Sequence, residues 1–117
     1  MDFQVTTRQE AGDLAVIEVT GEADLYTAPQ LRAALLNALE GTRWLAVDLA
    51  QVAYLDSTAL GVLIGALKRA RDAQGELCLL NPPPQVQRVL EVTRLAKVFP
   101  VFASAAEARA GMQEVKP

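Results

Sequence analysis

Residues 44–49, Trp-Leu-Ala-Val-Asp-Leu, form a nearly continuous apolar run with a single carboxylate, and this run restricts the fold more than any other part of the sequence. A strand of this composition has no face suited to water, so it belongs inside a sheet that is buried on both sides. A second short run of the same kind follows at residues 77–80. The chain is therefore expected to build a sheet that is covered by helices.

The other elements alternate between strands and helices. Strands are indicated by short apolar or alternating runs between turn residues, and helices by apolar residues three or four positions apart. The predicted strands are residues 3–8, 14–20, 44–49, 77–80 and 98–102, with a hairpin turn at Gly12-Asp13 between the first two. The predicted helices begin near residue 27, at residue 57 (residues 57–73), after the prolines at 82–84, and near residue 104, the last one ending at about residue 112. The order β-β-α-β-α-β-α-β-α predicts an α/β fold with a single mixed β-sheet and about four helices.

Two of the predicted helices have capping signals in the sequence. Thr27 is the expected N-cap of the first helix, Gln30 completes a capping box, and Gly41 is expected to close the helix as its C-terminal cap. Ser104 and Glu107 form a second capping box at the start of the last helix. These signals fix the ends of helices that the apolar spacing alone leaves uncertain.

The length of 117 residues and the 51% hydrophobic content predict a single domain covering residues 1–117. The net charge is −3 and the basic residues are scattered, so no nucleic acid partner is expected. No uncharged stretch is longer than residues 57–67, which are too few to cross a bilayer, and the start of the sequence lacks a secretory signal. We therefore expect a cytoplasmic protein with no membrane partner.

Histidine is absent and Cys78 is the only cysteine, which argues against histidine-based catalysis, disulfides and Cys-rich metal sites. The carboxylates Asp24, Asp48 and Asp56 could converge near strand ends, but such clustering is weak support for catalysis. An enzyme is therefore the weakest class of function, and no catalytic residue, metal or cofactor is predicted. Cys78 is expected to be a small buried apolar residue. Five aromatic residues are expected in the core or at its rim: Tyr26, Trp44, Tyr54, Phe99 and Phe102.

The segment Val52-Ala-Tyr-Leu-Asp-Ser-Thr-Ala-Leu-Gly61 is the candidate site, because it joins a buried strand to a helix. The carboxyl ends of strands are where α/β sheets usually meet ligands and partners. Ser57 is expected to be the N-cap of the helix, and a capping role alone would explain a serine there. A phosphate on Ser57 would also be tolerated at the positive end of the helix dipole, although Asp56 would repel it. Both interpretations stay open at this level.

A ridge of small residues, Ser57, Gly61 and Gly65, follows one side of the same helix and continues toward Lys68. Two glycines inside a helix cost roughly 1 kcal/mol each relative to alanine, so a compensating role is expected. The ridge either packs closely against a neighbouring helix of the same chain or forms a shallow groove in which another protein docks. The candidate docking residues are Gly61, Val62, Gly65 and Lys68.

Residues 56–65, Asp-Ser-Thr-Ala-Leu-Gly-Val-Leu-Ile-Gly, resemble the signature of STAS domains, specifically of bacterial anti-sigma-factor antagonists. Gly21-Glu-Ala-Asp-Leu-Tyr-Thr-Ala-Pro-Gln-Leu-Arg32 is similar to the second signature segment of that family, and residues 81–93 and 98–102 follow its pattern. Ala59 stands where many members have glycine. The resemblance extends from residue 3 to about residue 112, which it implies to be the core of a STAS-like fold.

By this resemblance Ser57 is the phosphoacceptor and Asp56 and Asp24 lie beside it. Thr58 is a weaker candidate, because its side chain is expected to point into the first helical turn. The implied partner is an anti-sigma factor with serine kinase activity, which the unphosphorylated chain binds so that a sigma factor is freed. Phosphorylation ends this binding and a phosphoserine phosphatase restores it. Some members interact with nucleotides, but this sequence has no phosphate-cradling glycine loop.

Two other functions compete with this one. A receiver domain would use an aspartate such as Asp48 as phosphoacceptor, but no acidic pair for Mg²⁺ follows the first predicted strand. Alternatively, the chain is a STAS subunit of a transporter or of a sensory complex, and acts as an interaction module without phosphorylation.

Overall fold

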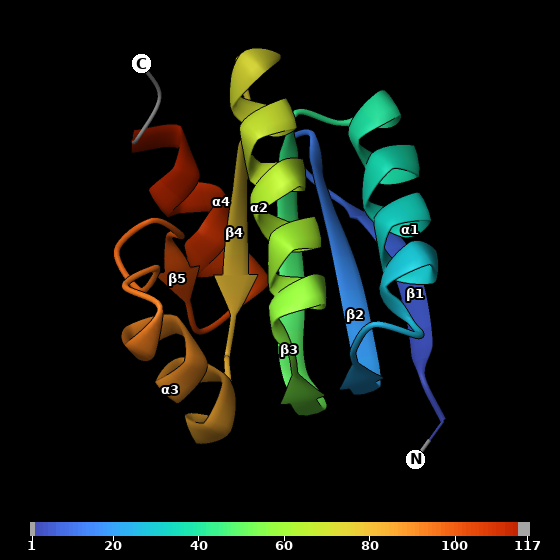
Figure 1. Cartoon of the computed structure of the whole chain (residues 1–117). Coiled ribbons are helices and arrows are strands. Elements are labelled where there is room, and N and C mark those ends of the chain that lie inside the picture. The colour runs from blue at the N-terminus through green and yellow to red at the C-terminus, as the bar shows by residue number, and fades with distance from the viewer. Residues whose placement is uncertain (1, 115–117) are drawn as a thin grey trace.

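The computed structural model describes residues 2–114, with side chains up to residue 112, so residue 1 and residues 115–117 of the predicted domain lie outside the described residues (Figure 1). Within this range the chain forms one sheet with the strand order β1-β2-β3-β4-β5. The predicted mixed sheet is confirmed: β1 and β2 form an antiparallel hairpin, and the other neighbours are parallel. The strands are β1 (Gln4–Glu10), β2 (Leu14–Ala23), β3 (Trp44–Leu55), β4 (Glu76–Leu80) and β5 (Val101–Phe102). The helices are α1 (Ala28–Gly41), α2 (Ser57–Asp72), α3 (Pro84–Val92) and α4 (Ala105–Glu114), in the predicted order.

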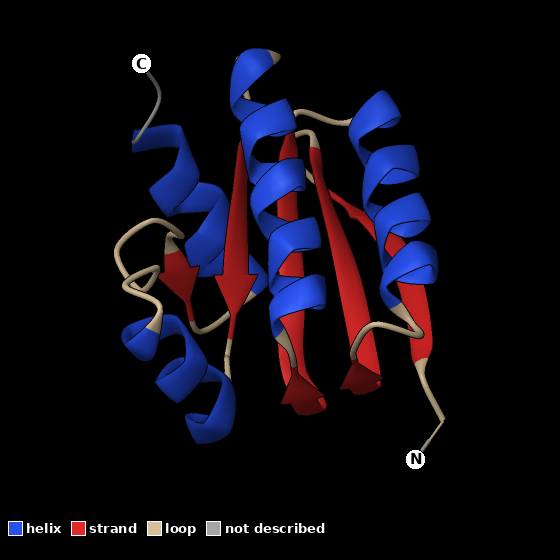
Figure 2. Cartoon of the chain, in the orientation of Figure 1, coloured by secondary structure: helices blue, strands red, loops and turns tan. Residues whose placement is uncertain are grey.

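The helices are divided unequally between the two faces of the sheet (Figures 1 and 2). Crossovers between parallel strands are right-handed, and β2 to β5 follow one another across the sheet in a single direction, so α1, α2 and α3 all fall on the same face. Their apolar sides close the larger core. Helix α4 covers the opposite face, where Ala108 and Met112 close a smaller core. Among the helices of residues 2–114, none combines the length and apolar composition that a bilayer crossing requires.

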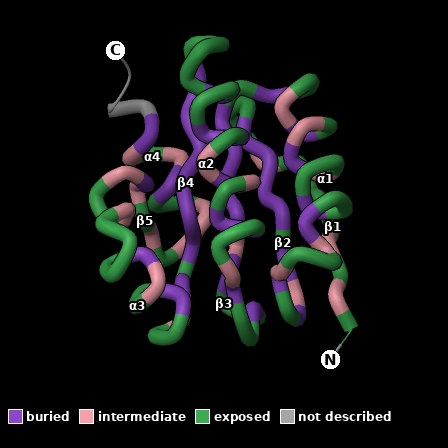
Figure 3. Tube along the Cα trace, viewed as in Figure 1, coloured by how far each residue is buried: buried purple, intermediate pink, exposed green. Residues whose placement is uncertain are grey.

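The first residues of β3 are buried on both faces, as the apolar run predicts. Leu45 and Val47 face the larger core, whereas Trp44 and Ala46 face the smaller one. The neighbouring strand β4 is buried along its whole length, which Figure 3 shows as an unbroken purple segment. These two strands therefore hold the two cores together.

Strands β2 and β3 continue past their predicted ends, to Ala23 and Leu55. Along the extension of β2 buried and exposed residues alternate. Along the extension of β3 two exposed residues separate each buried one, such as Val52, from the next. The pairing of β2 with β3 also shifts register twice, between Glu18 and Thr20 and between Gly21 and Glu22. The apolar run stops before the strand does, and for that reason the sequence underestimates its length.

Strand β5 is shorter than the predicted strand at 98–102. Phe99 is buried in the larger core, and Pro100 has no N–H to donate to a neighbouring strand. The Pro100 carbonyl still accepts the N–H of Leu79 at 2.9 Å, and this bond leads into the short ladder of Val101 and Phe102. Apolar composition here reflects burial of a loop rather than a strand.

Three predictions about helix ends have different outcomes. Thr27 occupies the N-cap position of α1 but makes no capping hydrogen bond with its side chain, so the predicted capping box is wrong. Gly41 is the last residue of α1 rather than its cap, a position that Thr42 takes in extended conformation. The second capping box is present in part: the Ser104 hydroxyl accepts the N–H of Glu107 at 3.1 Å, but the Glu107 carboxylate accepts the N–H of Ala103 at 3.3 Å rather than that of Ser104.

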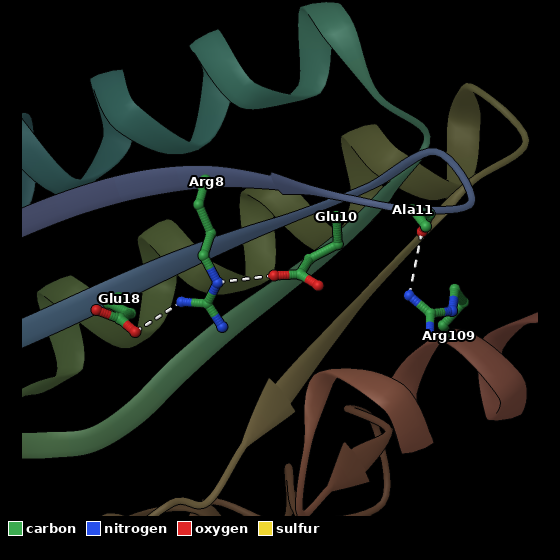
Figure 4. A network of polar contacts seen from close by, with 5 residues as sticks. All are labelled: Arg8, Glu10, Ala11, Glu18 and Arg109. Carbon is green, nitrogen blue, oxygen red and sulfur yellow. Dashed lines mark hydrogen bonds and ion pairs between the residues drawn. The ribbon is translucent and has the colours of Figure 1, made fainter.

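Ion pairs lie on the solvent side of the β1–β2 hairpin (Figure 4). The Arg8 guanidinium contacts Glu10 at 2.8 Å and Glu18 at 2.6 Å. On the α4 side, Arg109 donates to the carbonyl of Ala11 in the hairpin turn at 3.4 Å. Exposed pairs of this kind contribute little to stability, typically about 0–1 kcal/mol each, so the fold depends on its two cores.

Cys78 has the apolar role that the sequence predicts. Its side chain is fully buried in the smaller core. Burial first, and the charge of Glu76 second, raise the pKa of the Cys78 thiol to about 12. The thiol therefore stays protonated at physiological pH and is a poor nucleophile.

Gly61 and Gly65 lie on α2 where an added Cβ would meet nothing within 4 Å. Because alanine is the better helix former, Gly61→Ala is expected to raise the free energy of unfolding by about 0.5–1 kcal/mol, measured by urea denaturation. Gly75→Ala is the matched control, since its Cβ would overlap the Arg43 carbonyl and should destabilise the protein. Destabilisation by both substitutions would contradict the open surroundings of Gly61.

Candidate functional site

The carboxyl ends of β2 and β3 lie side by side at one edge of the sheet, next to the start of α2 (Figure 1). Ala23 at the end of β2 pairs with Leu55 at the end of β3, and the N–H of Asp56 donates to the Ala23 carbonyl at 3.0 Å. The two signature segments, residues 21–32 and 56–65, therefore meet at this edge. The candidate site is formed where they meet.

Asp56 is the N-cap of α2, which corrects the prediction that Ser57 has this position. One carboxylate oxygen, Oδ1, accepts the N–H of Ala59 at 2.9 Å in the first turn of α2. The other oxygen, Oδ2, accepts the N–H of Leu25 at 2.9 Å in the β2–α1 connection. A carboxylate serves both donors better than a single serine hydroxyl could, since it offers two acceptor oxygens. Asp56 thus fixes the β2–α1 connection against the start of α2.

Asp24 organises the β2–α1 connection from within. Its Oδ1 accepts the backbone N–H groups of Tyr26 at 2.9 Å and Thr27 at 3.1 Å. The Thr27 hydroxyl accepts the Asp24 N–H at 2.9 Å and donates to the Glu22 carbonyl at 2.9 Å. This exchange of hydrogen bonds is why Thr27 does not cap α1 with its side chain. Asp24 and Asp56 thus hold the same connection, and their role beside a phosphoacceptor stays a prediction.

Ser57 is the first residue of α2 and is exposed to solvent. Its hydroxyl makes no hydrogen bond to another residue within the described part of the chain. Capping therefore does not explain this serine, because Asp56 performs that function. The first turn of a helix has N–H groups without intrahelical partners, so an anion on the Ser57 oxygen would lie at a favourable helix end.

Thr58 differs from its predicted orientation. Its side chain is exposed and lines a hollow beside Leu25 and Ala28 of the neighbouring segment, rather than lying inside the first turn of α2. Asp56 already satisfies the first-turn N–H of Ala59, so the Thr58 hydroxyl has no capping role to fulfil. Two hydroxyls, those of Ser57 and Thr58, are thus accessible at this end of α2.

Three large apolar side chains are exposed around this edge of the sheet, and the sequence interpretation missed them. Leu25 and Tyr26 in the β2–α1 connection are 59% and 87% exposed, and Tyr54 near the end of β3 is 52% exposed. Tyr26 and Tyr54 are therefore not in the core or at its rim, whereas Trp44 and Phe99 are buried and Phe102 is half-buried as predicted. Strand alternation held no signal for Tyr54, because it would place Tyr54 on the face of Val52, which is buried in the same core as Leu55; the register shift between Gly21 and Glu22 breaks the alternation here. Exposed tyrosines beside a leucine are typical of protein interfaces.

The ridge on α2 is open rather than packed against a neighbouring helix of the chain. Gly61 and Gly65 are exposed, and a Cβ at either would meet no atom within 4 Å. Of the two explanations that the sequence left open, close packing inside the chain is wrong. Two hollows of about 390 and 330 Å³ lie between α1 and α2, and we call them together the α1–α2 groove. Among the candidate docking residues, Val62, Gly65 and Lys68 line this groove.

The fold excludes the receiver-domain alternative. Receiver domains have a parallel sheet with the strand order 2-1-3-4-5, whereas here β1 is antiparallel and the order is sequential. Asp48 lies within β3 on the face that α4 partly covers, and its Oδ1 accepts the N–H of Ala50 at 3.0 Å. Asp48 is therefore separated by the sheet from the α1–α2 groove and does not join Asp24 and Asp56.

Comparison with known proteins gives a consistent result. The family model described as "STAS domain" matches residues 4–108. The "Anti-sigma-B factor antagonist" of Listeria monocytogenes is 37% identical over 103 residues, which are 86% of this chain and 90% of the relative. In fold, the chain is similar to an anti-sigma factor antagonist from Mycobacterium paratuberculosis, with a TM-score of 0.84, 23% identity and coverage of 96% of this chain and 95% of the other. It is also similar to the Bacillus cell fate determinant SpoIIAA in its phosphorylated form, with a TM-score of 0.72, 22% identity and coverage of 92% and 98%.

Removal of the Asp56 carboxylate should destabilise both the start of α2 and the β2–α1 connection. Asp56→Ala is expected to lower the free energy of unfolding by about 1–2 kcal/mol, because both the helix cap and the bond to the Leu25 N–H are lost. Asp56→Asn keeps one acceptor oxygen and should lose about half as much. The control is Asp72→Ala at the exposed last residue of the same helix. Equal stabilities of all variants in urea denaturation would show that the Asp56 bonds are dispensable.

Proposed function

Because this chain belongs to the STAS domain family, we propose that it is a non-catalytic anti-sigma-factor antagonist whose binding to an anti-sigma factor is switched off by phosphorylation of Ser57. In this cycle the unphosphorylated chain binds an anti-sigma factor with serine kinase activity and frees a sigma factor. The kinase transfers a phosphate from ATP to the Ser57 hydroxyl, and a phosphoserine phosphatase removes it. ATP and sigma factors are cytoplasmic in bacteria, so the proposed cycle belongs in the cytoplasm.

The exposed hydroxyl of Ser57 at the start of α2 is the observation that carries this proposal. Asp56 caps the helix, so phosphorylation of the serine oxygen would break no capping hydrogen bond. The helix dipole and the free N–H groups of the first turn would stabilise the added charge. The curated relative carries the name of an anti-sigma-factor antagonist, and SpoIIAA, similar in fold, exists in a phosphorylated form.

The effect of the phosphate on a partner would be electrostatic. A phosphoserine adds about −1.5 to −2 charges at pH 7, next to the carboxylates of Asp56 and Asp24. The partner would contact the exposed residues Leu25, Tyr26 and Tyr54 around this point. A doubly charged group in the middle of such an interface loses its hydration on binding, which weakens the complex without unfolding the domain.

The alternative is a STAS subunit of a transporter or sensory complex that acts without phosphorylation. It predicts that binding to the partner is unchanged by an acidic residue at position 57. The two functions therefore differ in one measurable property, the sensitivity of binding to charge at Ser57.

Phosphate transfer tests the switch directly. Purified chain incubated with Mg-ATP and an anti-sigma factor kinase of the same genome should gain one acid-stable phosphate, which peptide mass spectrometry should map to Ser57. Ser57→Ala should bind this kinase without release by ATP, and Ser57→Asp should bind about tenfold or more weakly by calorimetry. Thr58→Ala is the matched control for the phosphorylation site and should still gain one phosphate on Ser57.

Two results would overturn the proposed switch. One is normal binding and ATP-dependent release of both Ser57 variants. The other is an acid-labile phosphate, which would indicate an acyl phosphate on an aspartate instead of a phosphoserine.

Docking along α2 is tested by adding bulk where the surface is open. Gly65→Arg should fold normally, since the site faces solvent, but should weaken binding of the anti-sigma factor by about tenfold or more. Gly65→Ala is the control and should bind nearly as the wild type does. Gly65→Arg with a normal melting temperature and full affinity would exclude this part of α2 from the interface.

A further inference from the structure

The α1–α2 groove has apolar side chains in its walls that the chain itself leaves partly exposed. The two hollows that form it share Arg32 and Val62, so they adjoin, and their lining residues on α2 run from Thr58 to Asp72. Leu35 and Ala66 are buried beneath the groove, whereas Leu36 and Val62 are half-buried in its walls. The groove therefore offers apolar surface at the level of the walls, where an inserted side chain would be shielded from water.

The rim of the groove is basic although the chain as a whole is acidic. Arg32 on α1 and Lys68 and Arg69 on α2 line the hollow, against a single carboxylate, Asp72. The net charge of the chain is −3, so the positive charge of this hollow is opposite in sign to that of the chain as a whole. No ion pair engages these three cations among residues 2–112, and all three are exposed. The rim is thus complementary to carboxylates from outside the chain.

The opposite charge lies at the Ser57 end of the groove. Glu22, Asp24 and Asp56 gather where the β2–α1 connection meets the start of α2, and Leu25 and Thr58 form the beginning of the groove there. The surface therefore changes from acidic at the Ser57 end to basic one to three helical turns along α2. A partner that matches both ends can dock in only one direction.

We propose that the α1–α2 groove binds a helix of the partner protein that has an apolar face flanked by acidic side chains, and that Arg32 and Lys68 set its direction. Helix α2 has 16 residues and is about 24 Å long, long enough for a partner helix of four turns to lie beside it. The apolar residues of that helix enter at Leu36 and Val62, and its carboxylates meet the basic rim. This inference rests on the proposed function only for naming the partner as the anti-sigma factor.

A pair of synthetic peptides tests the groove without the anti-sigma factor. Both are amphipathic helices of about 18 residues with leucine on one face, flanked by glutamate in one and by lysine in the other. The glutamate peptide should shift the amide resonances of Arg32, Val62, Gly65 and Lys68 and should bind about tenfold or more tightly than the lysine peptide. Equal affinities, no binding by the glutamate peptide, or shifts confined to another surface would overturn the proposal.

Reversing the charge of two rim residues tests the groove with a second probe, an anti-sigma factor kinase encoded in the genome that encodes this chain. The variant Arg32→Glu/Lys68→Glu should bind this protein about tenfold or more weakly than the wild type, with a loss that shrinks at high salt. The matched control is Arg88→Glu/Lys97→Glu, which makes the same change of charge at exposed positions outside the groove. Equal loss in both double variants, or loss in neither, would overturn the proposal.

Two further outcomes separate this inference from the function on which it partly rests. If no anti-sigma factor of the genome binds the wild type, the proposed function fails, and the peptide pair still decides the groove. If the chain alone dimerises in analytical ultracentrifugation and the Arg32→Glu/Lys68→Glu variant does not, the occupant is a second copy of the chain and the inference is wrong.

Discussion

Strand β3 needs cover on both faces, because its first four residues are buried and alternate between two cores. Right-handed crossovers place α1, α2 and α3 together on one face, so the opposite face receives only α4. That single helix protects only part of the second face. The carboxyl-terminal halves of β2 and β3 are therefore half in solvent, and their polar residues form an edge where the chain can present side chains without disturbing the cores.

The candidate site uses this edge, and Asp56 is its structural centre. Its two carboxylate oxygens accept two backbone N–H groups, that of Leu25 just after β2 and that of Ala59 in the first turn of α2. As a result the hydroxyl of Ser57 is left over, held in place by its backbone and available to another molecule. Asp56 and Asp24 also accept the backbone N–H groups of Leu25 and Tyr26, and these bonds hold the two exposed side chains in the β2–α1 connection, away from the sheet.

Much of the fold could be predicted from the sequence, because burial on two faces leaves long apolar runs. The order of elements, the mixed sheet, the hairpin at Gly12-Asp13 and the buried Cys78 all follow from local patterns. The predictions failed where tertiary contacts outweigh local ones: Phe99 is apolar because a loop is buried, and β3 continues where its composition becomes mixed. That residues 1–117 form a single domain with a core at residues 3–112 stays a prediction.

The sequence named the polar residues of the candidate site but missed its exposed apolar residues and misassigned its helix cap. The sequence brought Asp24, Asp56 and Ser57 together through the two signature segments, and their proximity depends on the pairing of β2 with β3. It assigned the cap to the wrong neighbour, because Asp and Ser are equally good N-caps and only the bond to the Leu25 N–H distinguishes them. The roles of Ser57 as phosphoacceptor and of the groove as docking surface stay predictions.

The open positions on α2 also affect how such modules can diverge. An added Cβ at Gly61 or Gly65 meets no atom of the fold within 4 Å, so the fold alone does not require glycine there and the molecules that touch this helix can impose the restriction. Two related copies in one bacterium could exchange residues at these positions and keep the same scaffold. Steric exclusion of the wrong partner would then insulate parallel signalling pathways from cross-talk at little cost in folding.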